Sequence, residues 1–152
     1  MKIATQLQHN PKTILVVDDE LCVLTIVKCM LECGDYNVLL ASSAAAALRI
    51  VENHDVTIDL LLTDVLMPGM QGPDLAERVL ALRPNIKALF MSGYADSDVV
   101  RVKVLDHNLV FLPKPFTSGG LLETVERALS VPTPDTLDPR IQDNVVSASH
   151  SR

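Results

Sequence analysis

The chain has 152 residues, a length typical of one domain, so separate catalytic and binding domains are not expected. Hydrophobic residues make up 48% of the chain and aromatic residues only 3%, which predicts a core built from leucine, valine, isoleucine and alanine. The formal net charge is -6, and no run of lysine and arginine is long enough to follow a phosphate backbone, so nucleic acid is not an expected direct partner.

The first half of the chain alternates apolar strands with helices. Residues 13–17 (TILVV) follow a turn signal and form a predicted buried strand, which stops at the acidic run 18–20. Apolar residues then recur at spacings of three and four up to Gly34, which favours a helix. The elements predicted after the first strand are a helix over 21–33, a strand over 36–40, a helix over 44–52 capped by Ser42 or Ser43, and a strand over 58–63.

The second half continues the same alternation after a loop marked by Pro68, Gly69 and Gly72. The predicted elements are a helix over 73–82, a strand over 86–91, a helix over 96–105, a strand over 109–112 and a helix over 117–130. Five strands alternating with five helices indicate a doubly wound α/β fold, a parallel sheet with helices on both faces. Ligands in such folds bind at the carboxyl ends of the strands, near the switch point in strand order.

The two ends of the chain differ in composition from the middle. Residues 1–12 are interpreted as a leader, 13–130 as the folded domain, and 131–152, rich in proline, serine, threonine and aspartate, as a flexible tail without an output domain. No apolar run approaches the length of a membrane span or a signal peptide. The sequence therefore predicts a cytoplasmic protein without membrane insertion.

Three cysteines, Cys22, Cys29 and Cys33, all fall in the predicted helix 21–33. Their number is odd, they form no CxxC motif, and no histidine lies nearby at metal-binding spacing. We interpret them as reduced residues that pack as small hydrophobes.

Chemically useful side chains follow four of the predicted strands. Asp18, Asp19 and Glu20 follow the first, and Asp64, Ser92 and Lys114 follow the third, fourth and fifth. Each alone is an ordinary turn or cap residue, but together they stand where this fold places its ligand site. Converging carboxylates repel one another unless a cation enters, and hard oxygen donors suit Mg²⁺.

A carboxylate beside a metal and a lysine has a further use, as the nucleophile toward a phosphoryl group. In that interpretation Asp64 accepts the phosphoryl group, while Lys114 and the Ser92 hydroxyl stabilise its oxygens.

Four stretches of the chain resemble the receiver domain of two-component response regulators, and are similar to the bacterial chemotaxis regulator. They are ILVVDDE (14–20), LLLTDVLMPGMQGPDL (60–75), LFMSGYA (89–95) and FLPKPF (111–116). The resemblance implies a flavodoxin-like five-stranded parallel sheet with strand order 2-1-3-4-5.

The resemblance also assigns roles to individual positions. It implies Asp64 as the phosphoacceptor, Asp18 and Asp19 as the acidic pair that holds Mg²⁺, and Lys114 as the lysine of the site. It further implies the backbone carbonyl of Leu66 as a metal ligand, Ser92 as the switch hydroxyl and Phe111 as the aromatic switch residue.

A receiver is a signalling module rather than an enzyme, although it catalyses its own phosphotransfer and a slow autodephosphorylation. The implied donor is a phosphohistidine on a histidine kinase or histidine phosphotransfer protein. The implied output passes through the face made by the fourth helix, fifth strand and fifth helix to a downstream effector protein. The chain is then a single-domain regulator or a receiver module of a hybrid histidine kinase, as a monomer or weak dimer.

Other functions fit the pattern less well. A phosphatase of the haloacid dehalogenase type also forms an aspartyl phosphate but needs an Asp-x-Asp pair and a cap, whereas Asp18 and Asp19 are adjacent. A nucleotide-binding protein needs a glycine-rich loop after the first strand, where this chain has acids. A pseudo-receiver without phosphorylation remains an alternative that a phosphodonor experiment distinguishes.

Overall fold

The computed structural model describes residues 10–93 and 110–130, which contain a five-stranded parallel sheet in the order β2-β1-β3-β4-β5. The strands are β1 (Thr13–Val17), β2 (Asn37–Ala41), β3 (Leu60–Asp64), β4 (Lys87–Ser92) and β5 (Val110–Pro113). This confirms the predicted fold class and strand order. The order reverses between β1 and β3, so the switch point lies between their carboxyl ends.

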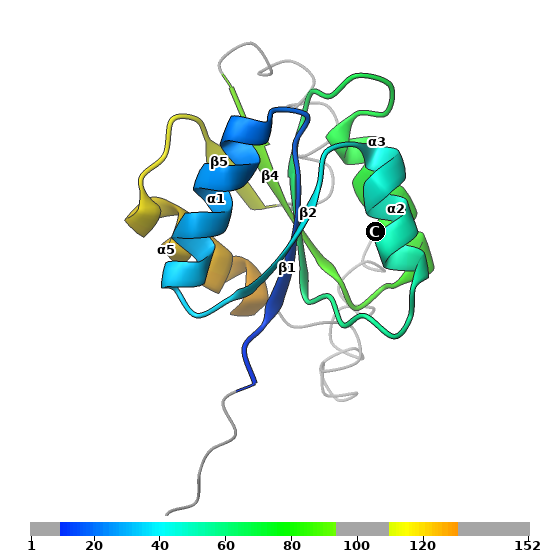
Figure 1. The fold of residues 1–152 in the computed structure, drawn as a ribbon, viewed down its shortest axis with the longest axis horizontal. Helices are drawn as coiled ribbons and strands as arrows, with labels where there is room; N and C mark the ends of the chain where they lie inside the picture. Colours follow the sequence, from blue (N-terminus) through cyan, green and yellow to red (C-terminus); the bar gives the residue numbers. More distant parts are fainter. Residues whose placement is uncertain (1–9, 94–109, 131–152) are drawn as a thin grey trace, which may run out of the picture.

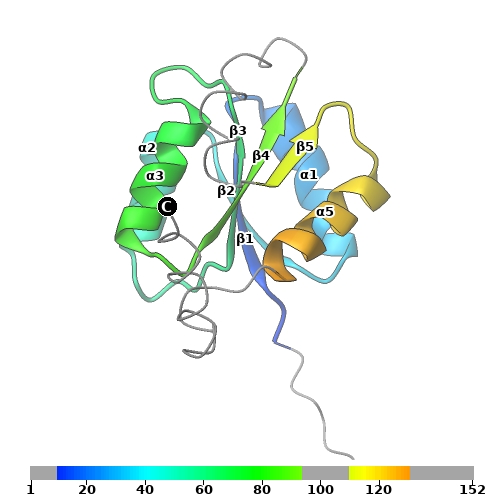
Figure 2. The ribbon, with the colours of Figure 1, turned by 180° about the vertical axis from the view of Figure 1, so that it is seen from behind.

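Helices cover both faces of the sheet (Figures 1 and 2). They are α1 (Leu21–Cys33), α2 (Ala44–Glu52), α3 (Gly72–Leu82) and α5 (Ser118–Ser130). Helices α1 and α5 lie on one face, and α2 and α3 lie on the other. The helix predicted over 96–105 lies outside the described residues. Within the described part of the chain, no helix is both long and apolar enough to cross a membrane.

Alternate side chains of each strand supply the two halves of the core. In β1, Ile14 and Val16 pack toward α1 and α5, whereas Leu15 and Val17 pack toward α2 and α3. All four are fully buried, which is why the sequence of this strand is an unbroken run of apolar residues. Helices on both faces leave no solvated side of the central strands, so the polar groups of the fold gather at the strand ends.

The observed elements follow the predicted ones closely, with small shifts in the strands. β1, α1 and α2 have the predicted bounds, and the side chain of Ser43 caps α2 by accepting a hydrogen bond from the Ala46 amide at 3.1 Å. The strand predicted over 58–63 begins at Leu60 instead. The Asp59 carboxylate accepts a hydrogen bond from the Thr13 amide at 2.8 Å, so Asp59 fastens the start of β1.

The three cysteines do not pack as predicted. Leu24, Val27 and Leu31 form the buried stripe of α1, and all three cysteines are exposed. The apolar stripe at three- and four-residue spacing is therefore the buried one, as predicted. The cysteines lie off that stripe, and the expectation that they pack rested on residue type alone.

Thr117 caps the first turn of α5. Its hydroxyl accepts a hydrogen bond from the Gly120 amide at 3.1 Å, and its carbonyl accepts one from the Leu121 amide at 2.9 Å. We expect Thr117→Ala to lower the free energy of unfolding by about 1 kcal/mol, because the amide loses its partner. Urea unfolding checks this, with Thr25→Ala as the control: Thr25 is an exposed α1 residue whose hydroxyl bonds a carbonyl inside its own helix. Equal effects of the two substitutions would contradict the capping role.

Candidate functional site

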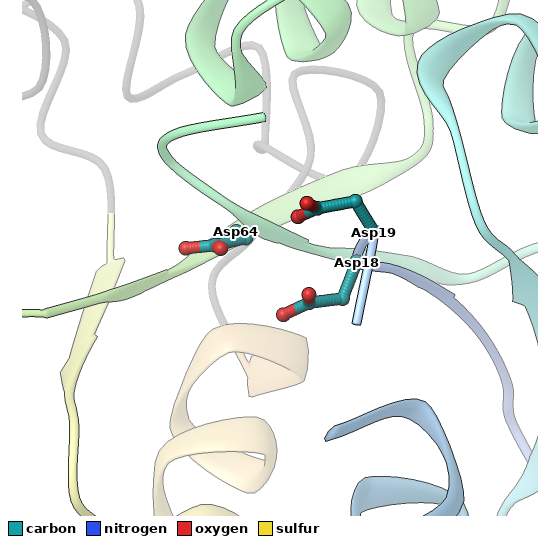
Figure 3. A group of neighbouring side chains, drawn as sticks. All are labelled: Asp18, Asp19 and Asp64. Carbon is teal, nitrogen blue, oxygen red and sulfur yellow. The ribbon is translucent and has the colours of Figure 1, made fainter. Parts of the chain in front are cut away.

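Three carboxylates converge at the carboxyl ends of β1 and β3. Asp18 and Asp19 follow β1, and Asp64 is the last residue of β3 (Figure 3). One carboxylate oxygen of each lies within 4.8 Å of the others. The Asp18 side chain is completely buried, that of Asp64 is 13% exposed, and Asp19 faces solvent. The cluster therefore has a buried side at Asp18 and a side exposed to solvent at Asp19.

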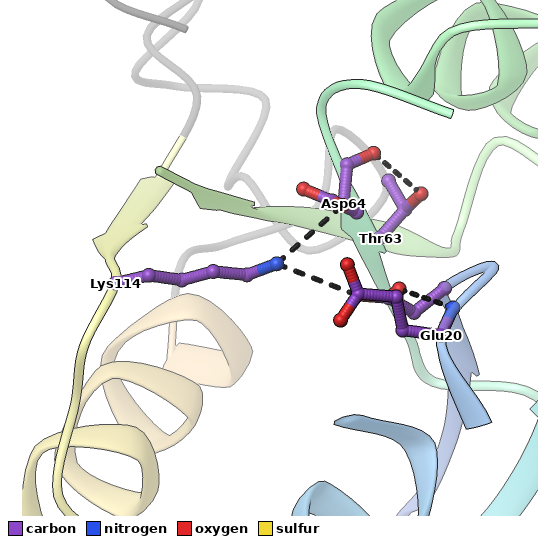
Figure 4. Close-up of polar contacts among 5 residues, drawn as sticks. Glu20, Thr63, Asp64 and Lys114 are labelled. Carbon is purple, nitrogen blue, oxygen red and sulfur yellow. Dashed lines mark hydrogen bonds and ion pairs between the residues drawn. The ribbon is translucent and has the colours of Figure 1, made fainter. Parts of the chain in front are cut away.

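Backbone contacts hold Asp18 in place. Its amide donates to the Ala41 carbonyl at 3.2 Å, which extends the β1–β2 ladder by one residue. Its carboxylate accepts a hydrogen bond from the Glu20 amide at 2.9 Å, at the position that caps α1 (Figure 4). Asp18 thus stabilises the sharp change from strand to helix while one of its two oxygens points into the site.

Lys114 reaches the same cluster from the segment after β5 (Figure 4). Its Nζ lies 3.4 Å from an Asp64 oxygen and 3.5 Å from an Asp18 oxygen. The Lys114 amide also donates to the Ser92 carbonyl at 2.7 Å, which fixes the base of the side chain against β4. Burial lowers the pKa of Lys114, but the charges of Asp64 and Asp18 outweigh it and leave that pKa above its ordinary value. Lys114 is therefore a charged ammonium at neutral pH.

The loop after Asp64 is anchored to the sheet. The Val65 amide donates to the Met91 carbonyl at 3.1 Å, and the Gly72 amide donates to the Val65 carbonyl at 2.8 Å. Gly72 is buried so close to Asp64 that a Cβ atom there would overlap the Asp64 carbonyl oxygen. This close approach of α3 to the site was not predicted from the sequence, where Gly72 was interpreted only as a loop residue.

The remaining predicted positions lie on β4, on β5 and on the loop after β3. Ser92 ends β4, is 6% exposed, and directly follows Met91, the residue paired with Asp64. Leu66 is 37% exposed on the loop after Asp64. Phe111 is half-buried in β5, beside Phe90 in register, and packs against the core under α2 and α3.

The cluster is rich in carboxylates. Among the described residues, the ammonium group of Lys114 lies beside two of the three carboxylates, those of Asp18 and Asp64. All of the candidate ligand atoms are oxygens, the type preferred by hard divalent cations. Asp18, Asp19 and Asp64 are therefore the described residues that could hold a cation.

Comparison with known proteins agrees with this geometry. The family model described as response regulator receiver domain matches residues 14–126. The sensor kinase CckA of Brucella abortus is 36% identical over 126 residues, 83% of this chain and 13% of the relative. The transcriptional regulatory protein ZraR of Escherichia coli is 35% identical over 122 residues, 80% of this chain and 27% of the relative. The chain thus spans about an eighth to a quarter of the length of these relatives.

Solved structures show the same fold. A CheY-like receiver domain protein from Methanospirillum hungatei matches with a TM-score of 0.70 and 33% identity, covering 78% of this chain and 94% of that one. A receiver domain protein from Clostridium thermocellum matches with a TM-score of 0.71 and 30% identity, covering 78% and 94%. The strand order, the acidic cluster and these matches agree, and the chain belongs to the response regulator receiver domain family of two-component signalling.

Proposed function

We propose that this chain accepts a phosphoryl group on Asp64 with the help of Mg²⁺. The observation that carries the proposal is the placement of Lys114, whose ammonium group lies 3.4 Å from Asp64 and 3.5 Å from Asp18 at the open carboxyl edge of the sheet. A cation fixed beside a partly exposed carboxylate is suited to hold the oxygens of an incoming phosphoryl group.

The residues of the cluster fit Mg²⁺. Asp18, Asp19 and Asp64 supply carboxylate oxygens from two neighbouring strand ends, and the exposed side leaves room for water and for phosphoryl oxygens. The backbone carbonyl of Leu66 completes the proposed ligand set. When bound, the ion supplies positive charge that neutralises the transferred group.

The proposed reaction is a displacement at phosphorus. A carboxylate oxygen of Asp64 attacks the phosphoryl group of a partner phosphohistidine, the new P–O bond forms as the P–N bond breaks, and the imidazole leaves with its electron pair. Lys114 holds one phosphoryl oxygen, and the Ser92 hydroxyl donates a hydrogen bond to another. In this role the chain is a signalling module that catalyses its own modification and slow dephosphorylation, not an enzyme with a separate substrate.

Phosphorylation then changes the charge at Asp64 from one negative charge to about 1.5 to 2. The added oxygens draw the Ser92 hydroxyl toward the site, and Phe111 moves into the space that this leaves. The altered face comprises β5, α5 and the helix predicted over 96–105. A downstream effector protein reads that face.

The proposed phosphoryl donor is a histidine kinase or a histidine phosphotransfer protein. Relatives named a sensor kinase, ZraR and NtrC support a place in kinase-coupled signalling. The chain acts either as a single-domain regulator or as the receiver module of a hybrid kinase, in the cytoplasm.

Incubation with acetyl phosphate and Mg²⁺ tests the proposal. We expect the mass of one phosphoryl group to be added to the protein, and no addition to Asp64→Ala or to wild type treated with a chelator. Leu82→Ala, an exposed change on α3, is the control that keeps phosphorylation. No modification of wild type would identify a pseudo-receiver, and many turnovers of phosphate per protein would identify a hydrolase.

The exposed Leu66 side chain is proposed to slow hydrolysis of the phosphoryl group, because it is apolar and lies two residues after Asp64. Replacing it by asparagine gives an attacking water a hydrogen-bond partner. We expect Leu66→Asn to shorten the phosphoprotein half-life, with Leu66→Met as the control that leaves it unchanged. The release of phosphate over time measures both, and an unchanged half-life in Leu66→Asn contradicts the role.

A further inference from the structure

Strand β2 has a free edge. It is the outermost strand of the sheet, it pairs with β1 on one side, and no described strand lies on its other side (Figure 1). A free edge presents a row of unpaired backbone amides and carbonyls, which proteins protect with charged residues, proline or a covering segment. The sequence of β2 (NVLLA) contains no charged residue and no proline, so its own side chains do not protect the edge.

The backbone groups of Val38 and Leu40 form this free edge. The Asn37 amide donates to the carbonyl just before β1 at 2.9 Å, and the Ala41 carbonyl accepts from the amide just after β1 at 3.2 Å. Alternate residues of a strand in a parallel pair bond to the same neighbour, so Leu39 also bonds toward β1. Val38 and Leu40 therefore turn their amides and carbonyls to the free side, where they can bond to one further strand.

The described chain begins beside this edge. Residues 10–12, in dark blue in Figure 1, enter the sheet at the end where β2 begins. Together with Asn37, Val38 and Leu39 of β2 they line an open hollow of about 1080 Å³. Segment 1–9 lies outside the described residues and is joined to the chain at this hollow. It is thus attached where a strand along the free edge has to enter.

Segment 1–9 is long enough to turn back and cover β2. Five or six residues of a strand match the length of β2, which has five. The connection to β1 passes the end of β2, two strand spacings or about 10 Å, which three or four residues span. Because the segment starts where β2 begins, it runs in the opposite direction to β2. Doubly wound sheets accept an antiparallel strand at an edge.

The sequence of this segment is suited to an edge strand. Residues 3–8 (IATQLQ) alternate isoleucine, threonine and leucine with alanine and glutamine, the period of a strand with two unlike faces. Segment 1–9 contains no glycine and no proline, the residues that weaken a strand. It also contains no acidic residue, so Glu32 and Asp35, which line the hollow, do not repel it.

We propose that residues 3–8 add to the free edge of β2 as an antiparallel sixth strand, which covers the edge within one molecule. The amides and carbonyls of Val38 and Leu40 bond to the backbone of this strand. The proposal is independent of phosphorylation, because none of these groups belongs to the acidic cluster.

Amide hydrogen exchange of the full chain tests the proposal. In wild type, we expect the amides of Val38 and Leu40 to exchange slowly, as the amide of Leu39 does through its bond to β1. Thr5→Pro combined with Gln6→Pro removes the added strand, because consecutive amides of a strand point to opposite sides and one of the two faces β2 in either register. Exchange at Val38 and Leu40 should then rise about tenfold or more, and exchange at Leu39 should not change.

The matched control is Thr5→Ala combined with Gln6→Ala, which keeps both amides and should keep the protection of Val38 and Leu40. Fast exchange of these two amides in wild type overturns the proposal. Protection that survives the double proline variant, or that falls when the protein is diluted, also overturns it, because another segment or a second copy then covers the edge.

Nuclear Overhauser effects test the direction of the added strand. Opposed Hα atoms come close in an antiparallel pair, because its non-hydrogen-bonded pairs bring the two backbones together. We expect Hα–Hα effects between residues 3–8 and β2 in wild type and their loss in the double proline variant. Wild type without any such effect contradicts the antiparallel strand.

Discussion

Gly72→Ala is expected to destabilise the protein by about 3 kcal/mol, because a methyl group at this position has no room. Its Cβ would overlap the Asp64 carbonyl oxygen and crowd Val65 Cα, which are backbone atoms rather than flexible side chains. β3 is paired on both edges, by β1 and by β4, so its backbone cannot move aside easily. The same displacement would shift the Asp64 carboxylate, so phosphorylation should also fall.

The control for this substitution is Gly119→Ala in the first turn of α5. An added Cβ there meets nothing closer than the Thr117 hydroxyl, at 4.0 Å. Alanine favours a helix over glycine, so a gain of about 0.5 kcal/mol is expected. Thermal and urea unfolding measure both variants. A Gly72→Ala protein as stable as wild type would show that α3 can move away from β3 at no cost.

Lys114→Met is expected to lower the free energy of unfolding by about 2 kcal/mol when no divalent cation is present. The substitution keeps the length of the side chain but leaves the fully buried Asp18 carboxylate without the ammonium group 3.5 Å away. Lys114 is itself 26% exposed, so water reduces the effect below that of a fully buried pair. Mg²⁺ should restore part of the loss, and phosphorylation should be slower.

The pH dependence gives a second measurement of the same interaction. The pKa of Lys114 is raised in the folded protein from 10.5, so its stabilising contribution is complete below pH 10.5 and is lost as pH rises through the higher folded pKa. The stability difference between wild type and Lys114→Met should therefore be constant from neutral pH to that point and shrink above it. Lys28→Met, which removes the lysine of an exposed ion pair, is the control for the loss of one positive charge. A difference that already shrinks at neutral pH would contradict the ion pair.

Much of the site could be predicted because the fold places strand ends at one edge. Asp18, Asp64 and Lys114 are far apart in sequence, yet each stands at the carboxyl end of an apolar strand, and parallel strands end together. The helix and strand order was predictable for the same reason: apolar runs and turn residues alternate regularly along the chain. The strand bounds shifted by one or two residues, since apolar residues such as Ile58 are buried just outside a strand as well as within it.

One feature of the site depends on packing that the sequence does not reveal. The need for glycine at position 72 arises from the distance between α3 and the backbone of β3, which no local pattern encodes. The cysteines of α1 are a different case, because the apolar spacing predicted the buried face of this helix correctly. Cys22, Cys29 and Cys33 lie off that face, and residue type alone led to the wrong expectation that they pack.

Asp64 ends a central strand that is paired on both edges. Deletion of one residue should therefore be harmful within β3 and tolerated in the segment before it. Side chains alternate between the two faces of β3, so loss of one residue within Leu60–Asp64 leaves two outcomes. Either the leucines exchange faces, or the carboxylate turns away from Asp18. Loss of one residue from the largely exposed segment 53–57 neither moves the leucines to the other face nor turns the carboxylate away. Length variation among natural relatives should therefore accumulate before β3 and be absent from the strand itself.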